Sequence, residues 1–379
     1  MFILPVVILL LMNIYVFIRG WQVLPGGPLL RALYVVLYWI AALSFFLGRY
    51  VETRFPPFTG TVLAWVGSFW IVALIYFFLA ALFIDSLRLA NHIRPFFPAA
   101  LSRNPLRAKH LTALMVSGIV GIAVLGGHIN SRIPRIRELE FTVDKAAGGL
   151  TKLDIVLLSD LHLGILIGRA RLGKIVDKIN ELHPDVVLIP GDVADRGAEP
   201  VIREDMGEEF KRIKALYGVY ACTGNHEFFG GVQKTVDYLR AHKVNMLRDD
   251  ITKIADAFYV IGREDRSAPR RGFSRKGIAE LMAGVTENLP VIVLDHQPYE
   301  LGETAAAGVD VQFSGHTHYG QFWPVNHIVK ALYEVAWGYK KIGNTHFYVT
   351  NGVGTWGPPV RIGNRPEIVR IRLKFRPAP

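Results

Sequence analysis

A short stretch near the middle of the chain, Gly191 to Gly197, carries residue types that could do chemistry. It reads Gly-Asp-Val-Ala-Asp-Arg-Gly and follows an apolar, β-branched run, Asp185 to Pro190, that predicts a strand. A carboxylate at the carboxyl end of such a strand is well placed, because ligand sites in α/β sheets gather there. Alone, however, an aspartate in this position is more often a turn residue or a helix cap. The interpretation of Asp192 therefore depends on what else reaches the same edge.

Four further strand-like runs end in polar turns of similar character. The runs are residues 155–158, 219–222, 290–294 and 309–313, and the turns are Ser159-Asp-Leu-His162, Gly224-Asn-His-Glu227, Asp295-His-Gln-Pro298 and Gly315-His-Thr-His318. Five unrelated loops would have to acquire such ends independently. We therefore interpret the five turns as one site at one edge of a sheet.

The side chains in these turns suit two adjacent divalent cations. Carboxylate and amide oxygens mixed with imidazoles fit Mn, Fe or Zn, and the absence of thiolates argues against a structural zinc site. The carboxylate of Asp192 can bridge two ions about 4 Å apart, and such a pair can hold a phosphate and activate water. The sequence thus predicts a dinuclear metal site for phosphoester chemistry.

The order of these turns resembles that of the calcineurin-like metallophosphoesterase superfamily, and of its bacterial membrane-anchored branch in particular. The series is Asp-x-His, Gly-Asp, Gly-Asn-His-Glu, His and Gly-His-x-His, and the resemblance covers roughly residues 153–374. It implies two metal ions, with Mn²⁺ expected first. The implied ligands are Asp160, His162, Asp192 and His318 for one ion, and Asp192, Asn225, His296 and His316 for the other.

The resemblance also implies roles for residues beside the metals. His226 would face the leaving-group oxygen as a general acid or electrostatic stabiliser. The longer form Gly-Asp-x-x-Asp-Arg-Gly is similar to the phosphoprotein phosphatase branch, in which the second acid, here Asp195, orients the catalytic histidine and the arginine, here Arg196, touches phosphate. A glycine-rich turn, residues 350–361, is similar to a loop that closes one side of the site, which makes Trp356 and Arg361 expected substrate contacts.

Two other features leave alternatives open. The basic stretch from Arg263 to Lys276 is either a solvated loop or a contact for substrate or lipid headgroups beside the metals. Among the histidines outside the motifs, only His327 lies close enough in sequence to the site to be kept as a candidate. Cys222 is the single cysteine, so an internal disulfide is excluded.

Helical patterns alternate with the strands at residues 172–182, 204–216 and 232–241, which argues for a layered α/β domain. Residues 135–143 alternate polar and apolar side chains as an edge strand would, and residues 367–374 read as a final strand. The fold class that we expect is an α/β/β/α sandwich with two mixed sheets, preceded by transmembrane helices.

The front of the chain has a different composition. The 379 residues are 51% hydrophobic with a mean hydropathy of +0.28, which is too apolar for a plain soluble domain. The apolar excess lies in four runs, at residues 2–18, 32–47, 61–84 and 111–129, and a cleavable signal peptide would not explain the last three. We therefore expect a membrane domain of about four transmembrane helices over residues 1–130 and a catalytic domain over residues 131–379.

Charge suggests the partners and the orientation. The net charge of +11 favours contact with an anionic surface, and acidic phospholipid is the first candidate. The sequence has no basic stripe interleaved with aromatic residues, so nucleic acid is not expected as a partner. The connection between the third and fourth runs is rich in basic residues, from Arg88 to Lys109, and should be cytoplasmic. This places the catalytic domain on the extracytoplasmic side of the plasma (inner) membrane. Arg132, Arg135 and Arg137 favour the opposite side, so a cytoplasmic catalytic domain stays an alternative; the oligomeric state is left open.

The functional hypothesis is metal-dependent hydrolysis of a phosphoester or pyrophosphate. Four spans exceed what anchoring needs, so we expect a lipid-linked substrate such as a UDP-diacyl sugar or a related phospholipid. The alternatives are a phosphodiesterase, nuclease or protein phosphatase acting on soluble substrates. A membrane receptor or scaffold that kept the fold and lost turnover is a third possibility, which the intact ligand set disfavours.

Overall fold

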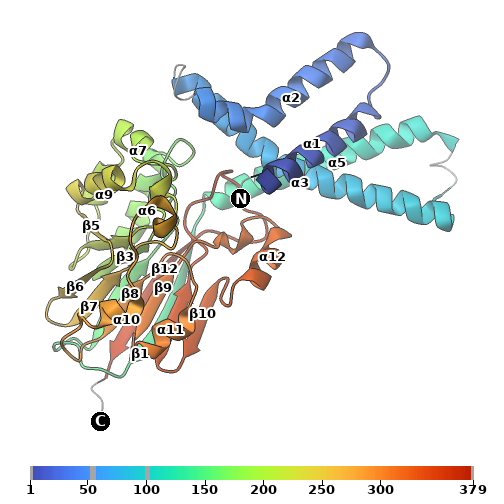
Figure 1. Cartoon of the computed structure of the whole chain (residues 1–379). Helices are drawn as coiled ribbons and strands as arrows, with labels where there is room; N and C mark the ends of the chain where they lie inside the picture. The colour runs from blue at the N-terminus through green and yellow to red at the C-terminus, as the bar shows by residue number, and fades with distance from the viewer. Residues whose placement is uncertain (1–2, 52–56, 99–102, 377–379) are drawn as a thin grey trace. The chain divides into compact units, whose positions relative to one another are not determined.

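A computed structural model describes residues 3–51, 57–98 and 103–376 of the chain. It divides into two compact units, Met1–His128 and Ile129–Pro379. The first is helical and the second is a mixed α/β domain (Figure 1).

The first unit is made of four long apolar helices, the last of which continues for three residues into the second unit. They are α1 (Ile3–Trp21), α2 (Pro28–Val51), α3 (Pro57–Ile93) and α5 (Pro105–Ser131). Each is long and apolar enough to cross a membrane. All four expected spans are therefore helices, and all extend beyond the apolar runs that predicted them. The run at 32–47 lies in a helix of 24 residues, about 36 Å long at 1.5 Å per residue.

Buried polar contacts join the first three helices. The Trp70 indole Nε1 donates to Asn13 Oδ1 at 3.0 Å, and the Tyr38 hydroxyl donates to the Asn13 carbonyl at 2.7 Å. Hydrogen bonds of this kind stabilise helix association where the surroundings are apolar. Asn13 therefore links α1 to both α2 and α3.

The second unit is built on two six-stranded sheets, each with parallel and antiparallel pairs. The first sheet has the order β1-β12-β2-β3-β4-β5, and its strands are β1 (Arg135–Val143), β2 (Lys152–Leu157), β3 (Val186–Pro190), β4 (Val219–Cys222), β5 (Val244–Leu247) and β12 (Glu367–Phe375). The second has the order β10-β11-β9-β8-β7-β6, with β6 (Asp250–Ile254), β7 (Phe258–Gly262), β8 (Val291–Leu294), β9 (Val311–Ser314), β10 (Gly338–Ile342) and β11 (Thr345–Val349).

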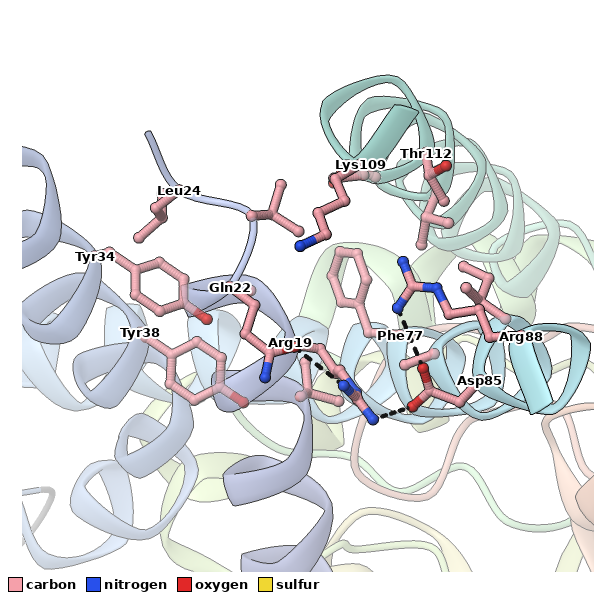
Figure 2. A pocket seen from close by; sticks show the side chains of 18 of the residues that line it. Arg19, Gln22, Leu24, Tyr34, Tyr38, Phe77, Asp85, Arg88, Lys109 and Thr112 are labelled. Carbon is pink, nitrogen blue, oxygen red and sulfur yellow. Dashed lines mark hydrogen bonds and ion pairs between the residues drawn. The ribbon is translucent and has the colours of Figure 1, made fainter. Parts of the chain in front are cut away.

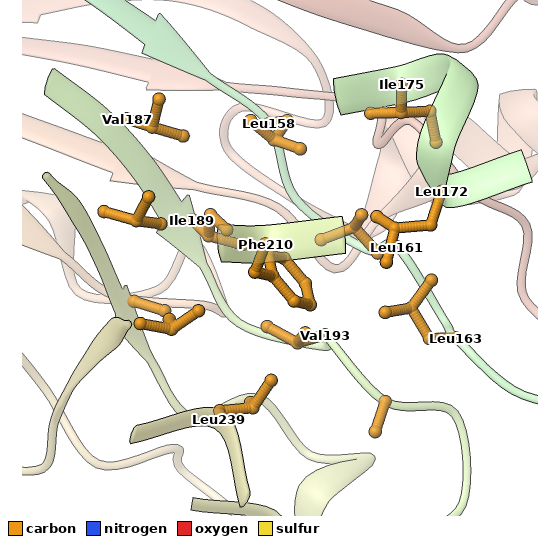
Figure 3. Packing of buried hydrophobic residues seen from close by; sticks show 14 of the residues in the cluster. Leu158, Leu161, Leu163, Leu172, Ile175, Val187, Ile189, Val193, Phe210 and Leu239 are labelled. Atoms are coloured by element: carbon orange, nitrogen blue, oxygen red, sulfur yellow. The ribbon is translucent and has the colours of Figure 1, made fainter. Parts of the chain in front are cut away.

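The alternation of side chains along a strand explains the layers. On β3, Val187 and Ile189 pack with α6 (Arg169–Glu181), α8 (Gly207–Lys211) and α9 (Val232–Ala241), as Figure 3 shows. Val186 and Leu188 point to the opposite face, where they join a cluster shared with β7, β8 and β9. The second sheet carries α10 (Ile278–Met282) on its outer face. The expected sandwich of two mixed sheets between helices is confirmed.

Some boundaries differ from the sequence prediction. The helix expected at 204–216 is reduced to the short α8, and a separate helix, α7 (Glu199–Arg203), precedes the predicted range; Asp205 between the two has a left-handed backbone with φ of 49°. An α-helix cannot continue through that conformation. By contrast, β1 lies at the edge of its sheet over the predicted residues, and α9 begins and ends as predicted.

Candidate active site and metal centre

Five connections bring the expected residues together, three from the first sheet and two from the second. They follow β2, β3, β4, β8 and β9. Five of the residues have left-handed backbones although none is glycine, with φ between 46° and 72°: Asp160, His162, Asp192, His316 and His318. Such conformations are sparsely populated and cluster at functional sites, where the surrounding structure holds them in place.

The first group of ligand atoms comes from Asp160, His162 and His318, all buried. The Nε2 atoms of the two histidines lie 2.9 Å apart, and His318 Nε2 lies 3.3 Å from Asp160 Oδ1. One ligand atom from each of the three residues lies within 4.8 Å of the others. This is the compact arrangement that a single cation requires.

The second group comes from Asp192, His296 and His316. His296 Nε2 lies 3.1 Å from Asp192 Oδ2, and His316 Nδ1 lies 3.0 Å from Asn225 Oδ1. Asp192 Oδ2 is also 3.7 Å from Nε2 of His162 in the first group. Asp192 therefore stands between the two groups, as a bridging carboxylate would.

The donors fit two cations. Burial lowers the pKa of both His316 and His318 to about 4, so both imidazoles are neutral at pH 7 and keep a lone pair for a metal. Burial also opposes the charged form of His296, but the Asp192 carboxylate outweighs it and holds the pKa of His296 well above its usual value. His296 Nε2 is buried 3.1 Å from Asp192 Oδ2, but it makes no hydrogen bond of good geometry among the described residues. A cation beside Asp192 would give that nitrogen a partner.

Glu227 holds the bridging carboxylate in position. It is completely buried, and its two oxygens accept hydrogen bonds from the backbone N–H groups of Asp192 (3.1 Å), Ala194 (2.9 Å) and Gly224 (2.7 Å). Burial and the nearby Asp192 charge raise the pKa of Glu227 to about 7. Glycine is required at 224 because a Cβ there would overlap the Asp192 carboxylate. Sequence reasoning gave Glu227 no role, although its place in the Gly-Asn-His-Glu turn was a signal.

His226 lies against two carboxylates. Its Nδ1 is 3.0 Å from Asp195 Oδ1, and its backbone N–H donates to Asp192 Oδ1 at 2.9 Å. Burial disfavours the charged imidazole, but the Asp192 and Asp195 charges outweigh it and raise the pKa of His226 to about 9. Arg196 Nε lies 3.6 Å from Asp195 Oδ2, and about a third of the Arg196 side chain is exposed. The three residues expected beside the metals are thus brought together.

Arg361 is placed differently from the expected phosphate contact. It is fully buried, and its Nη2 donates to the carbonyls of Asn351 and Gly354, both at 2.7 Å. The same Nη2 lies 3.3 Å from His318 Nδ1. Arg361 therefore contacts the candidate metal ligand His318 at Nδ1, the ring nitrogen that does not face Asp160. Trp356 of the same loop has an exposed side chain.

The basic stretch from Arg263 to Lys276 is partly internal. Arg263 and Arg275 each donate to the buried Asp295 carboxylate at 2.8 Å, so these two arginines stabilise the fold. Arg270 and Arg271 are exposed. His327 is also exposed and belongs to none of the candidate ligand groups among the described residues.

An apolar surface adjoins the site, and sequence reasoning did not identify it. The helix α12 (Val325–Leu332) has no buried residue, and Trp323, Ile328 and Leu332 are each more than half exposed. The Tyr333 ring, directly after the helix, has its centroid 6.1 Å from that of His316. The exposed Leu332 is therefore the direct neighbour of Tyr333, whose ring contacts the candidate metal ligand His316.

Comparisons with known proteins agree with this geometry. A sequence model of the family described as "Calcineurin-like phosphoesterase" matches residues 153–320. The chain is 32% identical over 274 residues to the "Transmembrane protein with metallophosphoesterase domain" of Danio rerio, covering 69% of this chain and 62% of that protein. It is 31% identical over 260 residues to an uncharacterised metallophosphoesterase of Campylobacter jejuni, covering 68% of each.

A third relative, an uncharacterised metallophosphoesterase of Helicobacter pylori strain J99, is 30% identical over 242 residues, which cover 63% of this chain and 64% of that protein. The chain thus spans a little under two thirds of the Danio rerio and Helicobacter pylori proteins. The chain belongs to the calcineurin-like metallophosphoesterase family, as its five motif turns indicated.

Proposed function

We propose that the protein is a membrane-bound, dinuclear-metal phosphohydrolase that cleaves a phosphoester or pyrophosphate. The observation that carries this proposal is the position of Asp192 between two compact ligand groups, one with His162 and His318 and the other with His296 and His316. Asp160 and Asn225 complete the two sets. Mn²⁺ is the metal that we expect first, with Fe or Zn as alternatives.

The residues around the two groups have distinct tasks. When bound, the two ions would polarise a phosphoryl oxygen and make water a better nucleophile at neutral pH. His226, with a pKa raised to about 9, holds a proton that it can give to the leaving oxygen. Asp195 fixes the imidazole through Nδ1. Arg196, partly exposed beside Asp195, would neutralise charge on the phosphate.

A lipid-linked phosphoester or pyrophosphate is the substrate that we propose. The support is the exposed apolar surface of Trp323, Ile328 and Leu332 on and before α12, whose following residue Tyr333 packs on His316. Acyl chains could cover this surface while the phosphate reaches the metals. Trp356 adds a second exposed aromatic side chain. With Arg361 buried, selectivity for lipid rests on these apolar groups.

We also propose that the catalytic domain lies outside the plasma (inner) membrane. The support is the basic connection between α3 and α5, which carries Arg94 and Arg103 and is followed by Arg107 in the first turn of α5; this basic stretch favours the cytoplasm.

The substrate proposal can be tested with the full chain purified in detergent and supplied with Mn²⁺. Hydrolysis would be compared on a UDP-diacyl sugar or other lipid-linked phosphate and on a small soluble diester. Changing Ile328 and Leu332 together to Ser should lower the rate on the lipid substrate by about tenfold or more, because two apolar contacts are lost, and should leave the diester rate unchanged. Leu216→Ser, at an exposed leucine elsewhere in the domain, is the matched control.

Equal loss on both substrates would remove α12 from substrate recognition. A protein that cut only water-soluble nucleotides or phosphoproteins would instead favour the nuclease or protein phosphatase alternative. Absence of turnover on every substrate class, with both metals bound, would favour the receptor or scaffold.

A further inference from the structure

A cavity of about 540 Å³ lies within the helical unit. It is formed where α1 ends, α2 begins, α3 approaches its end and α5 starts (Figure 2). Most of its lining is apolar or aromatic, including Val16, Leu37, Phe77 and Val116. The volume is in the range of sites that bind small molecules.

The polar part of the lining is predominantly cationic. Arg19, Arg88 and Lys109 come from three different helices and their nitrogen atoms point toward the same space (Figure 2). Asp85 is the one carboxylate in the lining, and both arginines pair with it, Arg88 at 3.4 Å. Three cations around one carboxylate leave two positive charges without a counter-charge.

Lys109 has fewer polar contacts than the two arginines of the cavity. Within the described parts of the chain it makes no ion pair or side-chain hydrogen bond; it lines the cavity, and its side chain is exposed. These charged side chains lie just beyond the apolar runs, and basic side chains at such helix ends reach the lipid headgroup layer. An uncompensated ammonium group beside apolar walls needs an anionic partner that also has an apolar part.

We infer that this cavity binds a phospholipid with an anionic headgroup. The phosphate would lie among Arg19, Arg88 and Lys109, and the acyl chains would cover the apolar walls. A free phosphate would satisfy the charges but leave Leu37, Phe77 and Val116 facing water, so the lining as a whole favours a lipid. This site lies within the helical unit and does not depend on the proposed hydrolase activity.

The test uses the full chain reconstituted in nanodiscs with phosphatidic acid or phosphatidylcholine of the same acyl chains. Lipids retained after gentle release would be counted by native mass spectrometry. The unchanged protein should retain phosphatidic acid in clear preference to phosphatidylcholine. Lys109→Ala should weaken that preference by roughly fivefold, as expected for loss of one basic residue near a headgroup, and Lys109→Arg should restore it.

Arg107→Ala is the matched control. Arg107 lies on α5 two residues before Lys109, carries the same charge and does not line the cavity. This variant should leave the preference unchanged. Equal retention of both lipids by the unchanged protein would overturn the inference, as would equal effects of the Lys109 and Arg107 changes. Displacement of phosphatidic acid by inorganic phosphate at equal concentration would also overturn it, since the site would then recognise a free anion.

Discussion

The Nε2 atoms of His162 and His318 lie 2.9 Å apart, although 156 residues separate them in the chain. His162 follows β2 in the first sheet and His318 follows β9 in the second, so only the face-to-face packing of the sheets brings them together. Two imidazole nitrogens at this distance, with Asp160 Oδ1 3.3 Å from one of them, converge on the position of a shared cation. The proposed cation site at His162 and His318 therefore depends on the packing of the two sheets against each other.

The first prediction concerns Glu227 as a positioning residue. Glu227→Ala should reduce Mn²⁺ affinity by roughly 10- to 100-fold, as for other groups that orient metal ligands, because three backbone N–H groups around Asp192 lose their acceptor. Glu227→Gln, which keeps one acceptor oxygen, should lie between Ala and the unchanged protein. Isothermal titration of the metal-free full chain would measure this. Unchanged Mn²⁺ affinity in the alanine variant would remove Glu227 from the metal site.

His226 should act on the reaction rather than on metal binding. His226→Ala should retain its metals and lose about 100-fold or more in kcat, as expected for a positioned acid. The loss should be largest on substrates with poor leaving groups, since these need the proton most. His327→Ala changes an exposed histidine outside the site and should behave like the unchanged protein. Near-native turnover of His226→Ala on a poor leaving group would contradict the assignment.

Arg361 should prove to be a structural residue. Arg361→Ala leaves the buried carbonyls of Asn351 and Gly354 without their donor, at a cost of about 3 kcal/mol or more. The melting temperature should fall by roughly 5 °C or more, and rates on lipid and soluble substrates should fall together. Arg365→Ala, at an exposed arginine of the same loop, is the control. A loss confined to the lipid substrate, with unchanged stability, would restore Arg361 as a substrate contact.

Orientation can be measured cleanly because the only native cysteine, Cys222, is completely buried. Arg270→Cys and Arg94→Cys each place one thiol at an exposed position. An impermeant maleimide should label Arg270→Cys in intact cells, and Arg94→Cys only after the membrane is opened. The reverse pattern would place the catalytic domain in the cytoplasm.

Much of the fold could be predicted because its signals are local. The alternating residues of β1 and the amphipathic residues of α9, followed by the left-handed Lys243, fix element type and length within a few neighbours. The motif turns could be recognised because each follows an apolar strand. The membrane helices extend past the predicted runs because basic residues at their ends, such as Arg19, continue the helix while the charge reaches polar surroundings.

The remaining features depend on contacts between distant segments. Arg361 in a glycine-rich loop has the same local sequence whether its guanidinium faces substrate or backbone carbonyls, and only the tertiary structure decides. Glu227 acquires its role from Asp192 and Ala194, which are more than thirty residues away. The apolar periodicity of α12 predicts a buried face, yet none of its residues is buried.

Asp192 offers the most direct test of the proposed dinuclear site. The full chain would be purified with Mn²⁺, its bound metal counted by elemental analysis, and its hydrolysis of a soluble diester measured beside Asp192→Ala and Asp237→Ala, a change at an exposed carboxylate on α9. We expect two ions per chain and full activity in the unchanged protein and in Asp237→Ala. Asp192→Ala should lose bound metal and at least about 100-fold in rate, since the lost group contributes several kcal/mol to transition-state stabilisation through the ions. Two ions still bound to Asp192→Ala, with hydrolysis at the native rate, would contradict the account.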